Sequence, residues 1–85
     1  MSFTIPEAVR QQMKQQASAA KMPYGTVVGQ KVYDLHGLVQ VLTDELRAAQ
    51  GAGDTKKVNE VTSKLKHRQA ELAAYQAEQG SAGVS

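Results

Sequence analysis

The chain has 85 residues, a formal net charge of +2, and neither cysteine nor tryptophan. This length limits the chain to one small domain, and the missing cysteines exclude disulfide bonds and thiolate metal sites. No run approaches the roughly 18 consecutive apolar residues that a membrane-spanning helix needs, so we expect no membrane segment. Residues 4–7 turn polar where a secretory signal would be apolar, and we therefore expect a cytoplasmic location.

The first expected element is a short helix over residues 4–21. Thr4 and Glu7 have the spacing of a capping box, in which both side chains satisfy free backbone donors at a helix start. Because its apolar face is narrow, we expect this helix either to pack on the rest of the chain or to stay mobile until a partner binds. The apolar residues recur every four positions, at Ile5, Val9, Met13 and Ala17.

Residues 24–33 follow a helix-breaking Pro23 and are expected to form a small β-hairpin. Two runs containing β-branched residues flank Gly29 and Gln30, a pair that is compatible with a two-residue turn. In the alternative interpretation residues 22–30 form a loop and the next helix begins near Lys31. An isolated two-stranded ribbon is marginally stable, so the β-hairpin would have to lie on the helices or pair with another chain.

The most regular pattern predicts two further helices, over residues 34–50 and 54–79. Gly51 and Gly53 provide turn geometry, so we expect the chain to reverse direction at residues 51–54. The apolar residues of the two helices then meet in antiparallel order. We expect Asp34 to cap the first of these helices and either Asp54 or Thr55 to cap the second. The two series, both in 3-4-3-4-3 spacing, are Val32, Leu35, Val39, Leu42, Leu46 and Ala49, and Val58, Val61, Leu65, Arg68, Leu72 and Tyr75.

The sequence therefore predicts a mainly α-helical protein with an antiparallel, coiled-coil-like helical hairpin. It predicts one domain over residues 1–80 and a flexible tail over residues 80–85. Because the last helix is expected to be longer than its partner, its end should project beyond the hairpin. With so thin a core, self-association or a protein partner is the expected means of stabilisation. The expected protein interface comprises Tyr33, Arg68, Leu72, Tyr75 and Ala77.

Arg68 stands opposite Val39, at a position where the pattern calls for an aliphatic side chain. In one interpretation its stem packs on the hairpin while the guanidinium reaches water. In the other, the guanidinium pairs with Asp44 or Glu45 of another subunit and fixes the register between the two.

Two histidines, His36 and His67, are the only candidates for base or metal-ligand chemistry. They lie one turn out of register on the expected hairpin, and the sequence places no third ligand or orienting carboxylate near them. No glycine-rich phosphate loop is present. We therefore expect no catalytic, cofactor or metal site and no small-molecule substrate.

The leading expectation is a non-enzymatic helical module for protein–protein interaction or assembly, with a homo-oligomer as one form. The small size also suits an accessory protein of viral or phage origin, an expectation that rests on no motif. The alternative is a small helical dimer that binds nucleic acid through basic stripes on the first and last helices. No aromatic residue interleaves these stripes for base stacking. The candidate nucleic-acid contacts are Arg10, Lys14, Lys57 and Lys64.

Overall fold

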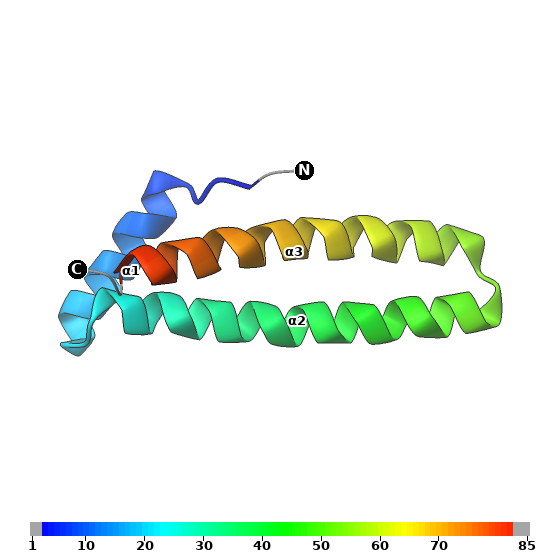
Figure 1. Cartoon of the computed structure of the whole chain (residues 1–85), viewed down its shortest axis with the longest axis horizontal. Helices are drawn as coiled ribbons and strands as arrows, with labels where there is room; N and C mark the ends of the chain where they lie inside the picture. Colours follow the sequence, from blue (N-terminus) through cyan, green and yellow to red (C-terminus); the bar gives the residue numbers. More distant parts are fainter. Residues whose placement is uncertain (1–2, 83–85) are drawn as a thin grey trace.

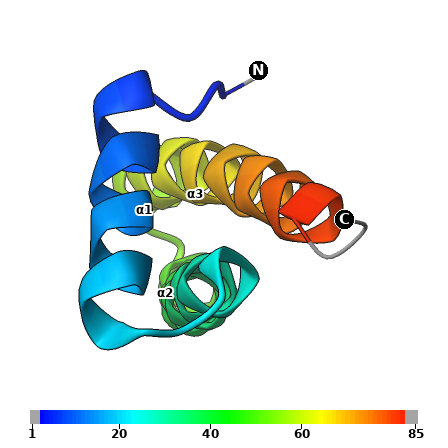
Figure 2. The same cartoon turned by 90° about the vertical axis from the view of Figure 1, so that its left-hand side faces the viewer.

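The computed structural model describes residues 3–82 and contains three helices: α1 (Glu7–Ala20), α2 (Tyr24–Ala52) and α3 (Thr55–Ala82). The helices α2 and α3 lie side by side in antiparallel directions and give the protein a length of 49 Å and a width of 21 Å (Figure 1). Viewed along the hairpin, α1 crosses its open end and packs against α2 (Figure 2). Within residues 3–82, no helix combines the length and the apolar character that crossing a membrane requires.

The β-hairpin expected over residues 24–33 is wrong, because the whole segment belongs to α2. Pro23 has an extended backbone (φ −60°, ψ 145°) and stands immediately before the first helical residue, Tyr24. The β-branched pair Val27 and Val28 favours a strand locally, but both side chains are buried, and Val28 is fully inaccessible to solvent. Packing of these side chains therefore overrides their weak backbone preference.

The helix α2 also starts ten residues before the predicted Asp34 cap, and Asp34 lies exposed within it. The antiparallel pairing of α2 with α3 consequently continues beyond the residue pairs that were predicted. A Cβ on Gly29 would lie 2.5 Å from Gln79 Nε2, and one on Gly25 would lie 3.8 Å from Ala82 Cβ. Because α2 has 29 residues and α3 has 28, the predicted overhang of the last helix is absent from the described residues.

The helix α1 begins and ends differently from the prediction. Pro6 occupies the N-cap position without a side-chain cap, so the capping box expected from Thr4 is not formed. Residues 3–6 instead run as a non-helical segment whose Ile5 side chain is only 5 % exposed. At the other end, Lys21 takes a left-handed conformation (φ 55°), and the Met22 N–H donates to the Ala17 carbonyl over 3.0 Å.

The turn between α2 and α3 confirms the predicted cap and glycine. Gly53 adopts a left-handed conformation (φ 70°), and the Asp54 N–H donates to the Ala49 carbonyl over 3.0 Å. The Asp54 carboxylate then accepts a hydrogen bond of 3.1 Å from the Lys57 backbone N–H. The other glycine, Gly51, is an ordinary helical residue of α2. Of the predicted tail, residues 80–82 continue α3, and residues 83–85 lie outside the described residues.

Replacing Gly53 by alanine and replacing Gly51 by alanine should have opposite effects on the free energy of unfolding. Gly53→Ala is expected to lower the free energy of unfolding by about 1 kcal/mol, because a side chain disfavours the left-handed conformation. Gly51→Ala is expected to raise it by about 0.5 kcal/mol, because alanine is the better helix former and nothing lies within 4 Å of the new Cβ. Urea unfolding followed by circular dichroism measures both. Equal effects of the two substitutions would contradict the turn geometry.

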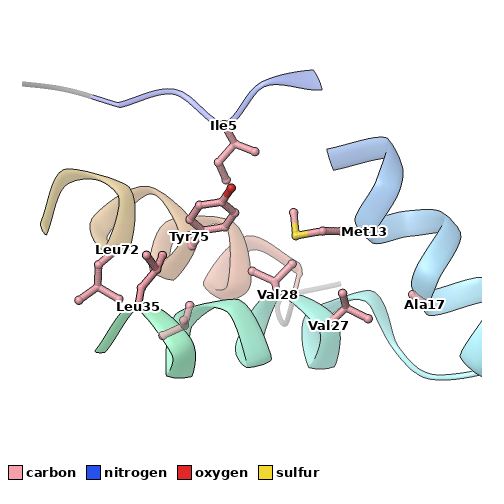
Figure 3. Packing of buried hydrophobic residues seen from close by; sticks show 9 residues of the cluster. Ile5, Met13, Ala17, Val27, Val28, Leu35, Leu72 and Tyr75 are labelled. Carbon is pink, nitrogen blue, oxygen red and sulfur yellow. The ribbon is translucent and has the colours of Figure 1, made fainter. Parts of the chain in front are cut away.

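The apolar core is concentrated at the open end of the hairpin, where all three helices and residues 3–6 meet. Figure 3 shows Ile5 against the Tyr75 ring and Met13 directed from α1 towards Val28. Towards the closed end the buried apolar side chains belong to α2 and α3 alone and include Leu42, Ala49 and Val61. The buried cluster at the open end comprises Ile5, Met13, Ala17, Val27, Val28, Val32, Leu35, Leu72 and Tyr75.

Candidate interaction surface

The structure does not bring the five expected interface residues together on one surface. Leu72 and Tyr75 are core residues with exposures of 9 % and 3 %, whereas Tyr33 on α2 is 74 % exposed. Ala77 is exposed on α3. Because α2 runs alongside the whole of α3, the end of α3 does not project from the hairpin, and Tyr75 there is buried while Ala77 stays exposed. Of the five expected interface residues, Tyr33 is the one that combines a large side chain with high exposure.

Arg68 finds its partner within the same helix. Its Nη1 donates to Glu71 Oε1 over 2.7 Å, and its side chain is 41 % exposed. Glu71 Oε1 also lies 3.2 Å from His67 Nε2, four residues earlier on the same helix, and Glu71 is itself buried. The three-residue spacing of Arg68 and Glu71 on a helix is the sequence signal for this pair. The Glu71 carboxylate thus lies between the Arg68 guanidinium and the His67 imidazole.

The two histidines lie in different surroundings. His36 Nε2 is 3.2 Å from Gln76 Nε2, which links α2 to α3. His67 contacts Glu71, and its ring meets that of Phe3 edge to face with centroids 6.2 Å apart. Within residues 3–82 no group of three or more histidine, cysteine or acidic side chains is arranged to hold a metal ion.

The candidate nucleic-acid residues fall into two pairs on different helices. Arg10 Nε and Nη2 donate to the two carboxylate oxygens of Glu78 over 2.8 and 3.3 Å, while Nη1 donates to Glu7 over 2.8 Å. Lys14 Nζ lies 6.0 Å from the centroid of the Tyr24 ring. Lys57 and Lys64 are exposed on α3. The guanidinium of Arg10 is therefore already matched by two carboxylates.

The Glu78 carboxylate is the point at which all three helices are joined. It accepts hydrogen bonds from Arg10 of α1 and, over 2.7 Å, from the Tyr24 hydroxyl of α2. Hydrogen bonds from Arg10, and then from Tyr24, hold the pKa of Glu78 below its usual 4.5. Burial, followed by the hydrogen bond to Glu78, raises the pKa of Tyr24 to about 12. This network fixes α1 across the hairpin.

Several exposed apolar side chains lie close together along the sequence of α2. Among the described residues, the exposed large apolar side chains are Tyr33 at 74 %, Val41 at 54 %, Met22 at 40 % and Leu38 at 37 %. Three of these four fall within residues 33–41. Gly37 lies between them with nothing within 4 Å of where its Cβ would be. We call Tyr33, Gly37, Leu38 and Val41 the α2 strip.

The α2 strip was missed because its helix was expected to begin at Asp34, which left Tyr33 in a ribbon. Leu38 and Val41 are also not members of the apolar series. An apolar residue outside that series is the sequence signal for a side chain that the hairpin does not bury. At Leu38, a shallow groove of about 480 Å³ runs along the surface between α2 and α3. The groove is lined by Leu38, Leu42, Ser63, Lys64, His67 and Arg68.

Comparison with known proteins gave no relative from which a role can be transferred. No protein-family model matches the chain, and no curated protein or solved structure matches it either. The α2 strip, the groove beside it and the Glu78 network are therefore judged on their own geometry.

Proposed function

We propose that this protein is a non-enzymatic helical module that binds protein, another copy of itself or a different chain, through the α2 strip. The observation that carries the proposal is the concentration of exposed Tyr33, Leu38 and Val41 within nine residues of one helix. A contiguous exposed apolar patch on a small protein is typical of an interaction site. Aromatic residues such as Tyr33 are also enriched among the side chains that dominate binding energy.

The helical scaffold suits this role because it holds the strip without using it for folding. Beneath the strip, Val32, Leu35 and Leu42 face the hairpin interior and are buried. Side chains of one helix that point away from such a core keep a fixed relative position. A partner therefore meets a surface that is ordered before binding, which reduces the entropy lost on association.

Nucleic-acid binding through Arg10, Lys14, Lys57 and Lys64 stays the alternative, and its salt dependence separates it from the apolar strip. Affinity based on phosphate contacts falls steeply as salt is raised, because counterions are no longer released favourably. Binding through the strip is expected to change little. Fluorescence anisotropy with labelled duplex DNA and RNA at two salt concentrations measures this difference.

The decisive test is a triple variant, Tyr33→Ser with Leu38→Ser and Val41→Ser. We expect it to lose association, measured by sedimentation velocity and by cross-linking in extracts of the source cell, while its thermal unfolding stays close to that of the unchanged chain. Exposed sites usually alter stability by no more than about 0.5 kcal/mol each. The matched control is Gln40→Ser with Lys66→Ser and Gln69→Ser, all exposed. If the strip variant keeps every contact that the control keeps, the proposal is wrong.

A further inference from the structure

The groove at Leu38 has an apolar wall and a basic wall. Leu38, which is 37 % exposed, and buried Leu42 form the wall on α2. None of the lining residues is acidic and none belongs to α1, so the groove is open where α1 no longer covers the hairpin. The wall on α3 consists of Ser63, Lys64, His67 and Arg68.

The positive charge of the α3 wall is only partly neutralised within the protein. Lys64 is exposed and, within residues 3–82, belongs to no ion pair, although Glu60 stands one turn before it. Arg68 is paired with Glu71, but its side chain is 41 % exposed and that of Glu71 only 11 %, so the cation is the more accessible member. A carboxylate that enters the groove therefore meets Lys64 and the exposed part of Arg68.

Two other grooves of the protein carry both signs of charge in their own lining. The groove between α1 and α2 is lined by Lys31 and Asp34 among other residues. The groove on α2 alone is lined by Asp44 and Arg47 together with two uncharged residues. The groove at Leu38 differs because its lining supplies cations only, which leaves the opposite charge to a partner.

The dimensions of the groove at Leu38 suit one turn of a helix. Along each wall the lining residues span four or five positions, which is about 6–7.5 Å of helix. Side chains three or four positions apart on a partner helix are separated by a similar distance. At His67 the groove meets the Phe3 ring, whose centroid is 6.2 Å from that of His67, so a partner helix extends from there towards the closed end of the hairpin.

From these observations we infer that the groove at Leu38 binds an acidic amphipathic helix of another protein, which presents an aliphatic side chain and a carboxylate one turn apart. The aliphatic side chain covers Leu38, and the carboxylate pairs with Lys64 and Arg68. This inference rests on the proposed function and adds the chemistry of the partner at Leu38. Tyr33 takes no part in it, because five residues before Leu38 correspond to about 140° around the helix.

Designed peptides test the charge requirement. The probe is a fluorescein-labelled peptide of about 15 residues, long enough to form a helix, with a leucine every seven residues and a glutamate four residues after each leucine. In two comparison peptides the glutamates are replaced by glutamine or by lysine. We expect the glutamate peptide to bind about tenfold more tightly than the glutamine peptide in fluorescence anisotropy. Equal affinities, or no binding of the glutamate peptide up to about 1 mM, would overturn the inference.

Charge reversal in the protein locates the contact. Lys64→Glu should weaken binding of the glutamate peptide by about tenfold and strengthen binding of the lysine peptide, because the charges are then opposite. Lys66→Glu is the matched control, since Lys66 is exposed on α3 and does not line the groove. It should leave both affinities within about threefold. If the two reversals had equal effects, the attraction would be general and the inference would be wrong.

A second pair of variants tests the apolar wall. Leu38→Ala should weaken binding of the glutamate peptide by about tenfold, because it removes the side chain that the leucine of the peptide covers. The matched control is Met22→Ala, since Met22 has a similar exposure of 40 % and lines the groove between α1 and α2. Thermal unfolding of both variants should stay close to that of the unchanged chain. Equal peptide affinities of the two variants would contradict the assigned contact.

The outcomes separate this inference from the proposed function. Equal binding of the glutamate and glutamine peptides, together with loss of association in the triple strip variant, overturns the inference and supports the proposed function. A strip variant that associates as well as the unchanged chain overturns both. Labelled duplex DNA that binds more tightly than the glutamate peptide, with equal losses in Lys57→Glu and Lys64→Glu, also overturns both in favour of phosphate contacts.

Discussion

Tyr75→Ala is expected to lower the free energy of unfolding by about 3–5 kcal/mol, the range found when a buried aromatic side chain is truncated. Tyr75 is 3 % exposed and lies in the open-end core, where its ring centroid is 6.2 Å from that of Phe3. The substitution removes the ring around which residues 3–6, α2 and α3 meet. Because small domains have total stabilities of only about 5–15 kcal/mol, this loss should shift urea unfolding strongly.

The matched control is Tyr33, a tyrosine of α2 in the opposite environment. It is 74 % exposed, so Tyr33→Ala should change the free energy of unfolding by no more than about 0.5 kcal/mol while reducing association. If Tyr75→Ala fails to fold, Tyr75→Phe keeps the ring and should retain most of the stability. Similar unfolding curves for the two alanine variants would contradict the assignment of Tyr75 to the core.

The antiparallel pairing of residues 32–49 with residues 58–75 could be predicted because it depends on spacing alone. Apolar residues at alternating intervals of three and four must lie on one side of a helix, and a glycine-containing turn between two such series makes them meet. Gly53 and Asp54 were predictable for a similar local reason, since a left-handed cap and a first-turn carboxylate have strong residue preferences. These features need no knowledge of distant contacts.

The start of α2 was mispredicted because local preference was given more weight than register. Val27 and Val28 favour strands, and Gly29 favours a turn, but continuing the same antiparallel order places position 28 opposite 79 and position 25 opposite 82. Gly29 lies close to Gln79 and Gly25 close to Ala82, so the small residues fit the helix contact. The inclusion of Tyr75 in the expected interface followed from the same error, because the end of the last helix was expected to project beyond its partner.

The contacts of α1 could not be predicted from the sequence. Arg10 and Glu78 are separated by 68 positions, and their bidentate contact depends on the angle at which α1 crosses the hairpin. Spacing within a helix carries no information about that angle. The α2 strip is intermediate. Leu38 and Val41 are recognisable as residues outside the apolar series, but their exposure also depends on α1 packing near Val27 and not reaching as far as Leu38.

Glu78→Ala is expected to release α1 from the hairpin while leaving the closed end intact. The substitution removes the acceptor of both the Arg10 guanidinium and the Tyr24 hydroxyl. With these hydrogen bonds lost, α1 should open more often, so amide hydrogen exchange at Met13 should accelerate by roughly 10-fold. Amides at Leu42, in the part of α2 that packs on α3 alone, should exchange at an unchanged rate.

The pH dependence of α1 docking should follow the same three side chains. Because the pKa of Glu78 is depressed in the folded protein, its stabilising effect is present above its usual value of 4.5 and is lost as pH falls through the lowered value. The pKa of Tyr24 is raised from 10.0 to about 12, so its effect is complete below pH 10 and is lost as pH rises towards 12. Exchange at Met13, corrected for its intrinsic pH dependence, should therefore be slowest between these limits.

Two variants assign the two limbs of this pH profile to their side chains. Glu78→Ala should remove the acid limb, and Tyr24→Phe, which keeps the ring but cannot ionise, should remove the alkaline limb and preserve the acid one. Leu42 in the unchanged protein is the internal control, because its protection should not follow α1. A profile at Met13 that is the same in all three proteins would show that α1 is held by its apolar face, through Met13 and Ala17, and not by the Glu78 network.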